Sequence, residues 1–299
     1  MTLLLEAGAD PNLTSTDGTT ALLTACYQGS TKIVQILVDH KADIKASNPQ
    51  RYSSIHIAAW NGYYQIVTIL LKAGMHHDTP TRDGNTPIAL AAHGGHQSVL
   101  DILLPLGCNV NNADKDQDTA LHYAAYNNMV DGVRKLLECG ADPNCQNSFS
   151  ATPLWNAIYM KHKNIVKLLL IANVNMEVSS VGINQHSQSD TAIRIYAEPR
   201  SPLYVAVDKG SFEILLLLIA AGYNLHKEAW VFNDDQYPCD CPLNVKSLLK
   251  KFAAEPPRLI SLCRNFFRKA LGQEIHNEVQ DLELPVTLQN YLLLGDVLS

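Results

Sequence analysis

The sequence predicts an all-α solenoid of helix-turn-helix repeats with β-turn fingers, followed by a short C-terminal α-helical segment. Three observations predict it. One period of 33 residues dominates the first two thirds of the chain. Apolar residues recur at helical spacing inside each copy. Near the C-terminus, residues 256–272 run from two prolines to a glycine, which are helix start and stop signals.

The period is carried by a threonine or serine that opens each copy. These residues are Thr20, Ser53, Thr86, Thr119 and Thr152, 33 residues apart, and then Ser201 after an insertion. The copies read Thr-Ala-Leu-Leu-Thr-Ala, Ser-Ser-Ile-His-Ile-Ala, Thr-Pro-Ile-Ala-Leu-Ala, Thr-Ala-Leu-His-Tyr-Ala, Thr-Pro-Leu-Trp-Asn-Ala and Ser-Pro-Leu-Tyr-Val-Ala. A period of 33 with this motif resembles the ankyrin repeat. The resemblance covers residues 1–225: a partial repeat at 1–14 and full repeats starting near 17, 50, 83, 116, 149 and 198.

Each position of the motif has a physical reason. The hydroxyl caps the first helix, and Pro87, Pro153 and Pro202 suit its first turn. Glycines permit the turn to the second helix, and Asp17-Gly18 and Asp83-Gly84 indicate β-turn fingers. We expect the core to hold a large apolar residue and an alanine from each copy: Leu22, Ile55, Ile88, Leu121, Leu154 and Leu203, with Ala25, Ala58, Ala91, Ala124, Ala157 and Ala206.

The regular pattern is interrupted at three places. The chain opens inside a repeat, which we interpret as an N-terminally truncated isoform or gene model, with a natural half-cap as the alternative. Residues 177–200 hold a polar insertion, which we expect to form an exposed loop. Residues 226–255 are a linker that is irregular from His226 to Pro242 and ends in a capping helix with Val245, Leu248, Leu249 and Phe252 at helical spacing.

Composition excludes several classes of protein. The net charge is −6 without a basic run, which disfavours a nucleic-acid partner. The seven cysteines are odd in number and scattered, which favours reduced thiols in the cytosol or nucleus. No targeting segment is visible, and the apolar run 214–221 is too short to cross a membrane, so a buried helix is expected there. We therefore expect a cytoplasmic or nuclear protein without a membrane contact.

Candidate catalytic and metal-binding residues have structural interpretations. His56, His122 and His96 occupy slots of the repeat motif, and His76-His77 is interpreted as a solvated surface pair without a spaced partner. Cys239-Asp240-Cys241 is too small a set for a structural zinc site, which takes four ligands. No phosphate-binding loop, nucleophile elbow or two-histidine metal helix is present. The sequence thus predicts neither an enzyme nor a cofactor site.

A ring side chain recurs seven residues after the capping hydroxyl. The five positions are Tyr27, Trp60, His93, Tyr126 and Tyr159, here called the ring ladder. In the ankyrin pattern this site is variable and faces the concave groove, where large amphipathic rings are favoured anchors of binding surfaces. We expect the ring ladder to be largely exposed and to bind a target protein. The alternative is that the rings only shield neighbouring helices from water.

The C-terminal segment, residues 256–299, resembles a SOCS box. Its first half has Leu259, Cys263 and Phe267 at the spacing of the elongin-binding motif, although Arg258 stands where that family has Pro, Ser or Thr. The stripe also includes Leu262 and Phe266. The second half resembles the cullin-binding motif, with Leu282, Leu284, Pro285, Leu288, Tyr291 and Leu292. The alternative is that these helices only cap the preceding domain.

Together, these resemblances point to the ankyrin repeat and SOCS box family. They imply a substrate-recognition subunit of a cullin–RING ubiquitin ligase. The SOCS box would bind elongin C with elongin B, and cullin-5, while the ankyrin repeats hold an unknown target protein for ubiquitination and degradation. The alternative is an ankyrin scaffold that joins two proteins without ubiquitin transfer.

Overall fold

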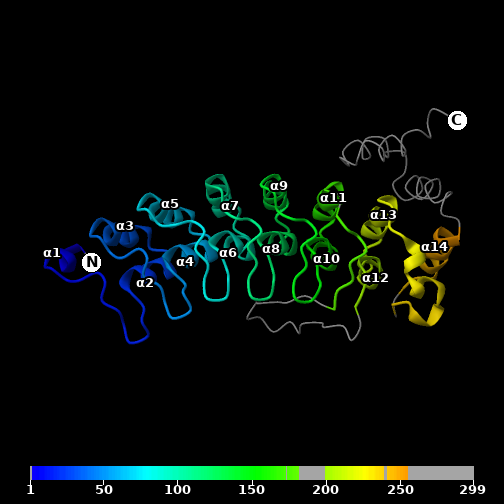
Figure 1. Cartoon of the computed structure of the whole chain (residues 1–299), viewed down its shortest axis with the longest axis horizontal. Helices are drawn as coiled ribbons and strands as arrows, with labels where there is room; N and C mark the ends of the chain where they lie inside the picture. Colours follow the sequence, from blue (N-terminus) through cyan, green and yellow to red (C-terminus); the bar gives the residue numbers. More distant parts are fainter. Residues whose placement is uncertain (1, 173, 182–198, 239–240, 255–299) are drawn as a thin grey trace, which may run out of the picture. The chain divides into compact units, whose positions relative to one another are not determined.

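The computed structural model describes residues 2–172, 174–181, 199–238 and 241–254 (Figure 1). Contacts divide the chain into two units, Met1–Ser148 and Phe149–Ser299. All regular elements of the described residues are helices, and β pairing is limited to isolated bridges. The expected all-α solenoid of ankyrin type is thereby confirmed.

The first unit stacks helix pairs in two layers (Figure 1). Neighbouring first helices pack on each other, as do neighbouring second helices, and each first helix packs on the second helix of its own pair. The first helices are α2 (Ala21–Tyr27), α4 (Ser54–Trp60), α6 (Pro87–His93) and α8 (Ala120–Tyr126). The second helices are α3 (Thr31–Asp39), α5 (Tyr64–Lys72), α7 (Gln97–Leu103) and α9 (Val130–Glu138), with the 3₁₀ turn η1 (Leu104–Leu106) after α7.

A short helix, α1 (Thr2–Glu6), precedes these pairs, and its Leu3 and Leu4 side chains are exposed. The core lies between the two layers. Every large apolar residue and every alanine expected in the core is at most 3% exposed in both units. In α5 the buried stripe is limited to Ile66, Val67 and Leu70.

Local chemistry sets where each first helix begins. The side chains of Thr20, Thr86, Thr152 and Ser201 accept the backbone N–H three residues on, at 3.1–3.4 Å. Ser53 and Thr119 instead form capping boxes in which a histidine three residues later takes the place of glutamate. These bonds satisfy amide groups that a helix start leaves unpaired. The six hydroxyls named by the period are thus the N-caps.

The two capping-box histidines are structural. The backbone N–H of Ser53 donates to His56 Nδ1 at 3.2 Å, so Nε2 carries the proton and donates to Thr79 O at 2.6 Å. Burial lowers the pKa of His56 to about 4, so its ring is neutral at physiological pH. His122 is fully buried and accepts the Thr119 N–H in the same way. The structural interpretation of these histidines is confirmed.

The turn between paired helices needs a left-handed residue. Gly29, Gly62, Gly95 and Gly210 have φ of 65–75° there, and Asn128 and Lys161 adopt the same conformation in the repeats without glycine. At Gly62 a Cβ atom would lie 2.4 Å from His96 Nδ1, so a side chain there is excluded by space as well as by backbone strain. This close approach places His96 against the end of α4.

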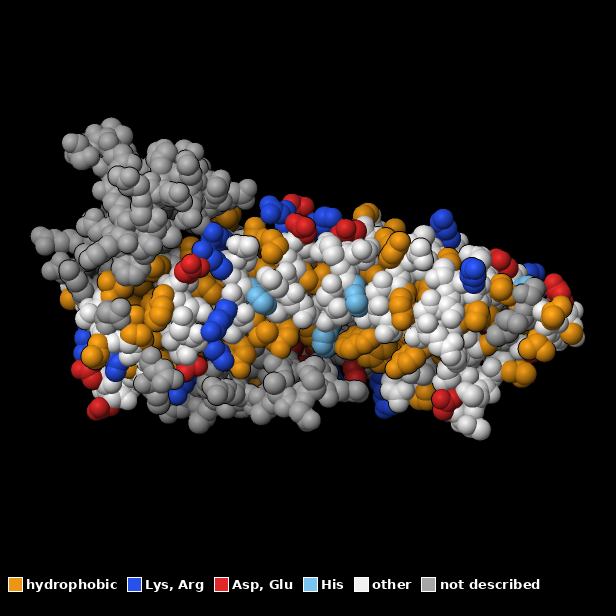
Figure 2. All heavy atoms as spheres, turned by 180° about the vertical axis from the view of Figure 1, so that it is seen from behind, with side chains coloured by type: hydrophobic (Ala, Val, Ile, Leu, Met, Phe, Trp, Pro, Cys, Tyr) orange, Lys and Arg blue, Asp and Glu red, His pale blue; other side chains and the backbone are white. Residues whose placement is uncertain are grey.

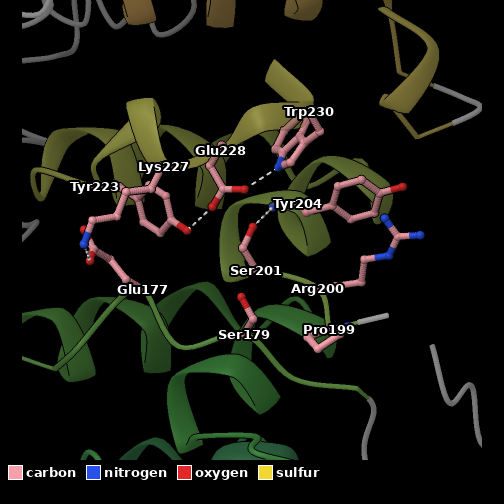
Figure 3. A pocket seen from close by; sticks show the side chains of 10 residues that line it. All are labelled: Glu177, Ser179, Pro199, Arg200, Ser201, Tyr204, Tyr223, Lys227, Glu228 and Trp230. Atoms are coloured by element: carbon pink, nitrogen blue, oxygen red, sulfur yellow. Dashed lines mark hydrogen bonds and ion pairs between the residues drawn. The ribbon is translucent and has the colours of Figure 1, made fainter. Parts of the chain in front are cut away.

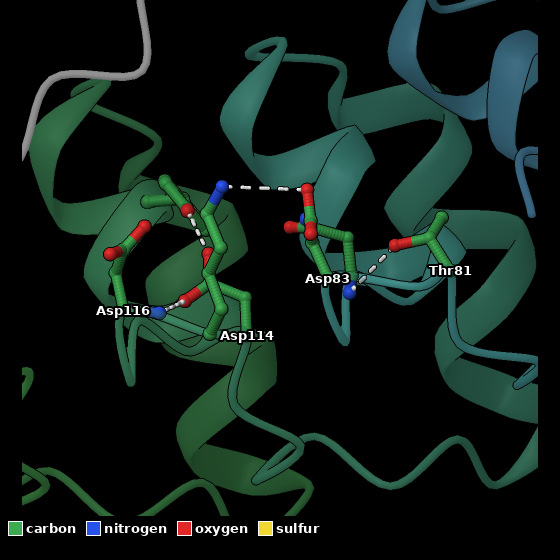
Figure 4. Close-up of polar contacts among 7 residues, drawn as sticks. Thr81, Asp83, Asp114 and Asp116 are labelled. Atoms are coloured by element: carbon green, nitrogen blue, oxygen red, sulfur yellow. Dashed lines mark hydrogen bonds and ion pairs between the residues drawn. The ribbon is translucent and has the colours of Figure 1, made fainter. Parts of the chain in front are cut away.

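The fingers of the first unit form a ladder of backbone bonds. The N–H groups of Arg82, Lys115 and Ser148 donate to Gln50 O, Asp83 O and Asp116 O at 3.0, 2.8 and 2.8 Å. Figure 4 shows two neighbouring fingers, one with Thr81 and Asp83 and the other with Asp114 and Asp116. Pro49 holds the corresponding position in the second finger and has no N–H to donate, so the ladder begins only after it.

The second unit contains two further helix pairs. They are α10 (Pro153–Tyr159) with α11 (Lys163–Ile171), and α12 (Pro202–Asp208) with α13 (Phe212–Ala220). Pro153 and Pro202 lie in the first turn of their helices, as expected, and residues 214–219 are buried. The ends of the insertion are paired, because Ser180 and Arg200 exchange N–H···O bonds of 3.0 and 2.8 Å. The expected exposed loop at 182–198 lies outside the described residues.

The linker after the last repeat is more ordered than the sequence suggested. The expectation of an irregular segment from His226 to Pro242 is wrong for its first part, which forms three short 3₁₀ helices. These are η2 (Leu225–Lys227), η3 (Ala229–Phe232) and η4 (Asp234–Gln236). The expected capping helix is α14 (Leu243–Ala254), which packs on η2 and η3 with Val245 and Leu249 buried. The buried Trp230 and Tyr237 rings explain the order.

Candidate protein-interaction site

The ring ladder stands at the last residue of each first helix. Tyr27, Trp60, His93 and Tyr126 end α2, α4, α6 and α8 in the first unit, and Tyr159 ends α10 in the second. Tyr27 is 72% exposed and Trp60 38% exposed. His93, Tyr126 and Tyr159 are half-buried, so of the five rings only Tyr27 is largely exposed, and the expectation is wrong for the others. Contacts with neighbouring side chains are the reason.

In the first unit two rings of the ladder, Trp60 and His93, form a cluster with Tyr123. Trp60 contacts His93 edge to face at 4.6 Å between centroids, and His93 stacks on Tyr123 at 4.3 Å with an interplanar angle of 8°. The buried Tyr123 hydroxyl donates to Asp114 Oδ2 at 2.5 Å. Neither Tyr123 nor Asp114 was expected at this surface from the sequence. The detectable signal was an aromatic residue in the same helix as Tyr126, three residues before it.

Backbone positions along this cluster are tied from one repeat to the next. His96 Nε2 bonds to Trp60 O at 2.9 Å, and Asn127 Nδ2 donates to Ala92 O and His93 O at 3.0 and 2.7 Å. Both acceptor regions are helix C-termini, whose carbonyl groups lack intrahelical partners. The ends of α4 and α6 are therefore held by the following repeat, which orders this part of the surface before any partner binds.

The finger behind the ring cluster carries a buried acidic group. Asp114 Oδ1 accepts the N–H groups of Asp116 and Asp118, both at 2.9 Å. Asp118 is 3% exposed and accepts from Asn147 Nδ2 at 2.9 Å. Burial raises the pKa of Asp118 to about 7, with the charge of Asp114 adding to this effect against the opposing hydrogen bond from Asn147.

In the second unit the ladder ring has different neighbours. Tyr159 stacks on the fully buried Trp155 at 5.3 Å, and Lys209 Nζ lies 4.0 Å from the centre of the Tyr159 ring. Trp155 Nε1 donates to Arg200 O at 3.1 Å. Here the ladder position is part of a packed aromatic pair covered by a cation. The face of the Tyr159 ring is thus covered by the Lys209 ammonium group and is not a bare aromatic surface.

The remaining sequence candidates that the structure describes include the His76-His77 pair. His76 and His77 stack on each other, but His77 Nδ1 also lies 3.3 Å from the buried Cys108 Sγ, so the expectation of no spaced partner was wrong. Burial is the main cause that raises the pKa of Cys108 to about 12, which keeps the thiol protonated. Cys239 and Asp240 lie outside the described residues. Within the described part of the chain, no three His, Cys, Asp or Glu side chains are grouped for a metal ion.

Hydrophobic side chains of the described residues do not form one continuous surface on the face in Figure 2. On the face in Figure 2, hydrophobic side chains lie in several groups separated by polar and charged ones. Among the described residues, no helix combines the length and apolar character that crossing a bilayer requires. The candidate elongin and cullin residues, Leu259 to Phe267 and Leu284 to Leu292, lie outside the described residues.

Comparison with known proteins defines the class. The family model of ankyrin repeats matches residues 1–81, 72–147 and 131–229, and the SOCS box model matches residues 255–293. The chain is also similar to ankyrin repeat and SOCS box protein 11 of Mus musculus, with 26% identity over 163 residues. The same protein of Homo sapiens and of Pongo abelii is 26% identical over 159 residues.

These matches cover 48% of this chain and 49–50% of the relatives, so the chain spans about half the length of the curated relatives it matches. The repeat array alone makes it an ankyrin repeat protein. With the second matched segment, the chain belongs to the ankyrin repeat and SOCS box family.

Proposed function

We propose that this protein is a substrate-recognition subunit of a cullin–RING ubiquitin ligase. The observation that carries the proposal is the order of its two matched segments: an ankyrin array that ends at residue 229 and a SOCS box at 255–293. The first segment suits target binding, and the second suits attachment to a ligase core. The names of the relatives contain the same pair of modules.

The ring ladder is the proposed target surface, with Tyr27, Trp60, His93, Tyr126 and Tyr159 as anchors. Exposure of Tyr27 and Trp60 and the bonds that hold the helix ends support this role. Aromatic anchors on an ordered backbone lose little conformational entropy on binding. The chain itself then acts by position, because it raises the effective concentration of a target lysine near the conjugating enzyme.

The ligase attachment is proposed on sequence grounds. Leu259, Leu262, Cys263, Phe266 and Phe267 would bind elongin C, which is joined to elongin B. The second set, Leu284, Pro285, Leu288, Tyr291 and Leu292, would bind cullin-5, and both sets lie within the residues that the SOCS box model matches. The competing function is a scaffold that joins two proteins through the ankyrin array alone.

Capture of purified partners by the full chain separates the two functions. We expect the chain to retain elongin B/C, and then cullin-5 only when elongin B/C is present. A double variant, Leu259→Ala with Cys263→Ala, should reduce elongin capture more than tenfold, which corresponds to about 1.4 kcal/mol of binding free energy.

A second double variant changes only the proposed cullin-5-binding residues. Leu284→Ala with Pro285→Ala should weaken cullin-5 capture and leave elongin bound. Unchanged helix content by circular dichroism is the control for both variants. Normal elongin capture by the first variant would leave the scaffold function as the better account.

A further inference from the structure

The second unit contains a small polar cavity of about 170 Å³. It lies between the segments that flank the insertion and the start of the 3₁₀ linker (Figure 3). The side chains of Tyr204, Tyr223 and Trp230 line it and are at most 9% exposed. Its volume is well above the requirement of a single water molecule, so a small polar group of a ligand fits.

A buried carboxylate faces this cavity. Glu228 is 7% exposed, and its two oxygens accept from the Tyr223 hydroxyl and from Trp230 Nε1 (Figure 3). Both donors are neutral. The neighbouring Lys227 is paired with Glu177 at the rim, and the described residues show no ion pair for Glu228 itself. A buried carboxylate stabilised only by neutral donors is favourable for an incoming positive charge.

The rest of the wall offers hydroxyl acceptors, and its two cations, Arg200 and Lys227, are engaged with the Tyr204 ring and with Glu177. Ser201 Oγ accepts the Tyr204 N–H at 3.1 Å and retains acceptor capacity, and the Ser179 hydroxyl lies in the same lining. The Tyr204 ring already has the Arg200 guanidinium 4.3 Å from its centre. This contact demonstrates that a positive group is accommodated on the aromatic wall.

We propose that this cavity binds one protonated amine, as presented by a lysine side chain of a bound protein segment, with Glu228 as its counter-ion. The ammonium group donates to the Glu228 carboxylate and to serine hydroxyls, and the aromatic walls surround its alkyl chain. An anionic ligand is disfavoured because Glu228 would repel it, and because the cations of the wall, Arg200 and Lys227, are engaged with the Tyr204 ring and with Glu177. The proposal does not depend on the ligase role, since all residues that line the cavity precede the SOCS box segment.

Nuclear magnetic resonance of the full chain tests the proposal. The chain has three tryptophans, and the Trp230 indole N–H donates directly to Glu228. Titration with Nα-acetyl-lysine methylamide should shift the Trp230 indole signal to saturation, whereas the signals of Trp60 and Trp155 stay in place. Nα-acetyl-norleucine methylamide, which has the same stem without the charge, should produce no saturable shift.

Substitution tests the counter-ion. Glu228→Gln keeps the shape and one acceptor oxygen but removes the charge, and should weaken lysine binding more than tenfold. Glu213→Gln is the matched control, because Glu213 lies outside the cavity lining, in an exposed ion pair with Lys163, and it should change the affinity less than threefold. An unchanged Trp155 signal verifies that the second unit remains folded in each variant.

Three results would overturn the proposal: no saturable shift with the lysine probe, an equal shift with the norleucine probe, or a shift with acetate in place of both. If Glu228→Gln does not fold, the comparison of the two probes on the wild-type chain still decides. Elongin capture, measured separately, reports on the proposed ligase role and is unaffected by any of these outcomes.

Discussion

The two units solve the same packing problem in different ways. In the first, the fingers after Pro49 donate a backbone N–H to the finger before them, and each first helix is capped by an equivalent hydroxyl or hydroxyl–histidine pair. The second repeats both devices, with caps at Thr152 and Ser201 and a bond from the Val181 N–H to Phe149 O, but an insertion interrupts its period. Its linker is held by contacts among Glu228, Tyr223 and Trp230, which the repeat pattern does not encode.

The largest expected effect is at a core side chain of the second unit. Trp155 is fully buried and its indole donates to Arg200 O, so Trp155→Ala removes a large packed side chain and a hydrogen bond. We expect a loss of about 3–5 kcal/mol in the free energy of unfolding. Urea unfolding followed by circular dichroism measures it. A loss below about 1 kcal/mol would mean that the second unit tolerates cavities and is not held by single contacts.

The next effect concerns charge in the fingers of the first unit. Because the pKa of Asp118 is raised to about 7, against about 3.9 in an unfolded chain, the folded state binds its proton more tightly. The contribution of Asp118 to stability is therefore highest below pH 4 and is lost as the pH rises through 7. Asp118→Asn should remove this dependence and raise the free energy of unfolding at pH 8 by up to about 4 kcal/mol.

An exposed ion pair in the same unit supplies the control. Asp101 lies 2.9 Å from Lys135 Nζ, and both side chains are more than 40% exposed. Asp101→Asn should change the free energy of unfolding by less than about 1 kcal/mol at either pH. Parallel pH profiles of the wild type and the Asp118→Asn variant would contradict the burial argument.

The sequence predicts the first unit more completely than the second, because signals that are local and repeated are easier to recognise than contacts that occur once. Thr86 and Pro87 are recognisable because a cap acts within one turn of helix, and the period repeats the signal. The contact of Tyr123 with His93 and Asp114 joins residues from different repeats, so no local motif encodes it. The linker at 226–242 has no copy elsewhere in the chain, and its order comes from buried rings rather than from helix propensity.

The proposed site, too, could be predicted from the sequence only in part. The ladder positions follow from the period, but their exposure depends on neighbours: Lys209 over Tyr159 comes from beyond the insertion. Glu228 is one of several acidic residues in a segment without a repeated pattern, and only its burial beside Tyr223 and Trp230 distinguishes it. Repeats thus reveal where a surface lies, and unique contacts determine its chemistry.

A smaller effect tests whether the caps of the first unit act singly. Thr86 accepts the Ala89 N–H, so Thr86→Ala leaves one amide at the start of α6 without its partner. We expect a loss of about 1 kcal/mol in the free energy of unfolding. Thr68→Ala is the control, because the Thr68 hydroxyl only donates to Tyr64 O within α5. Equal losses for the two variants would show that capping is not the cause.

The sharpest test of the ring ladder is at Trp60, where the expected change in stability is similar to that at Thr86. Its ring is 38% exposed and packs edge to face on His93, a contact worth about 0.5–1.5 kcal/mol. Trp60→Ala should therefore reduce the free energy of unfolding by about 1 kcal/mol, well below the effect at Trp155. If the ring ladder binds targets, the same variant should weaken binding of a captured target by more than 1 kcal/mol, over fivefold in affinity.

Tyr64 is the matched control, because it is 48% exposed in the same repeat but begins the second helix, away from the ladder. Tyr64→Ala should leave target affinity unchanged. A Trp60→Ala chain that loses stability but binds its target normally would assign the ring to packing against His93, and the search for the recognition surface would move to the fingers. A loss of target affinity that exceeds the loss of stability would show that the Trp60 ring contacts the target in addition to packing on His93.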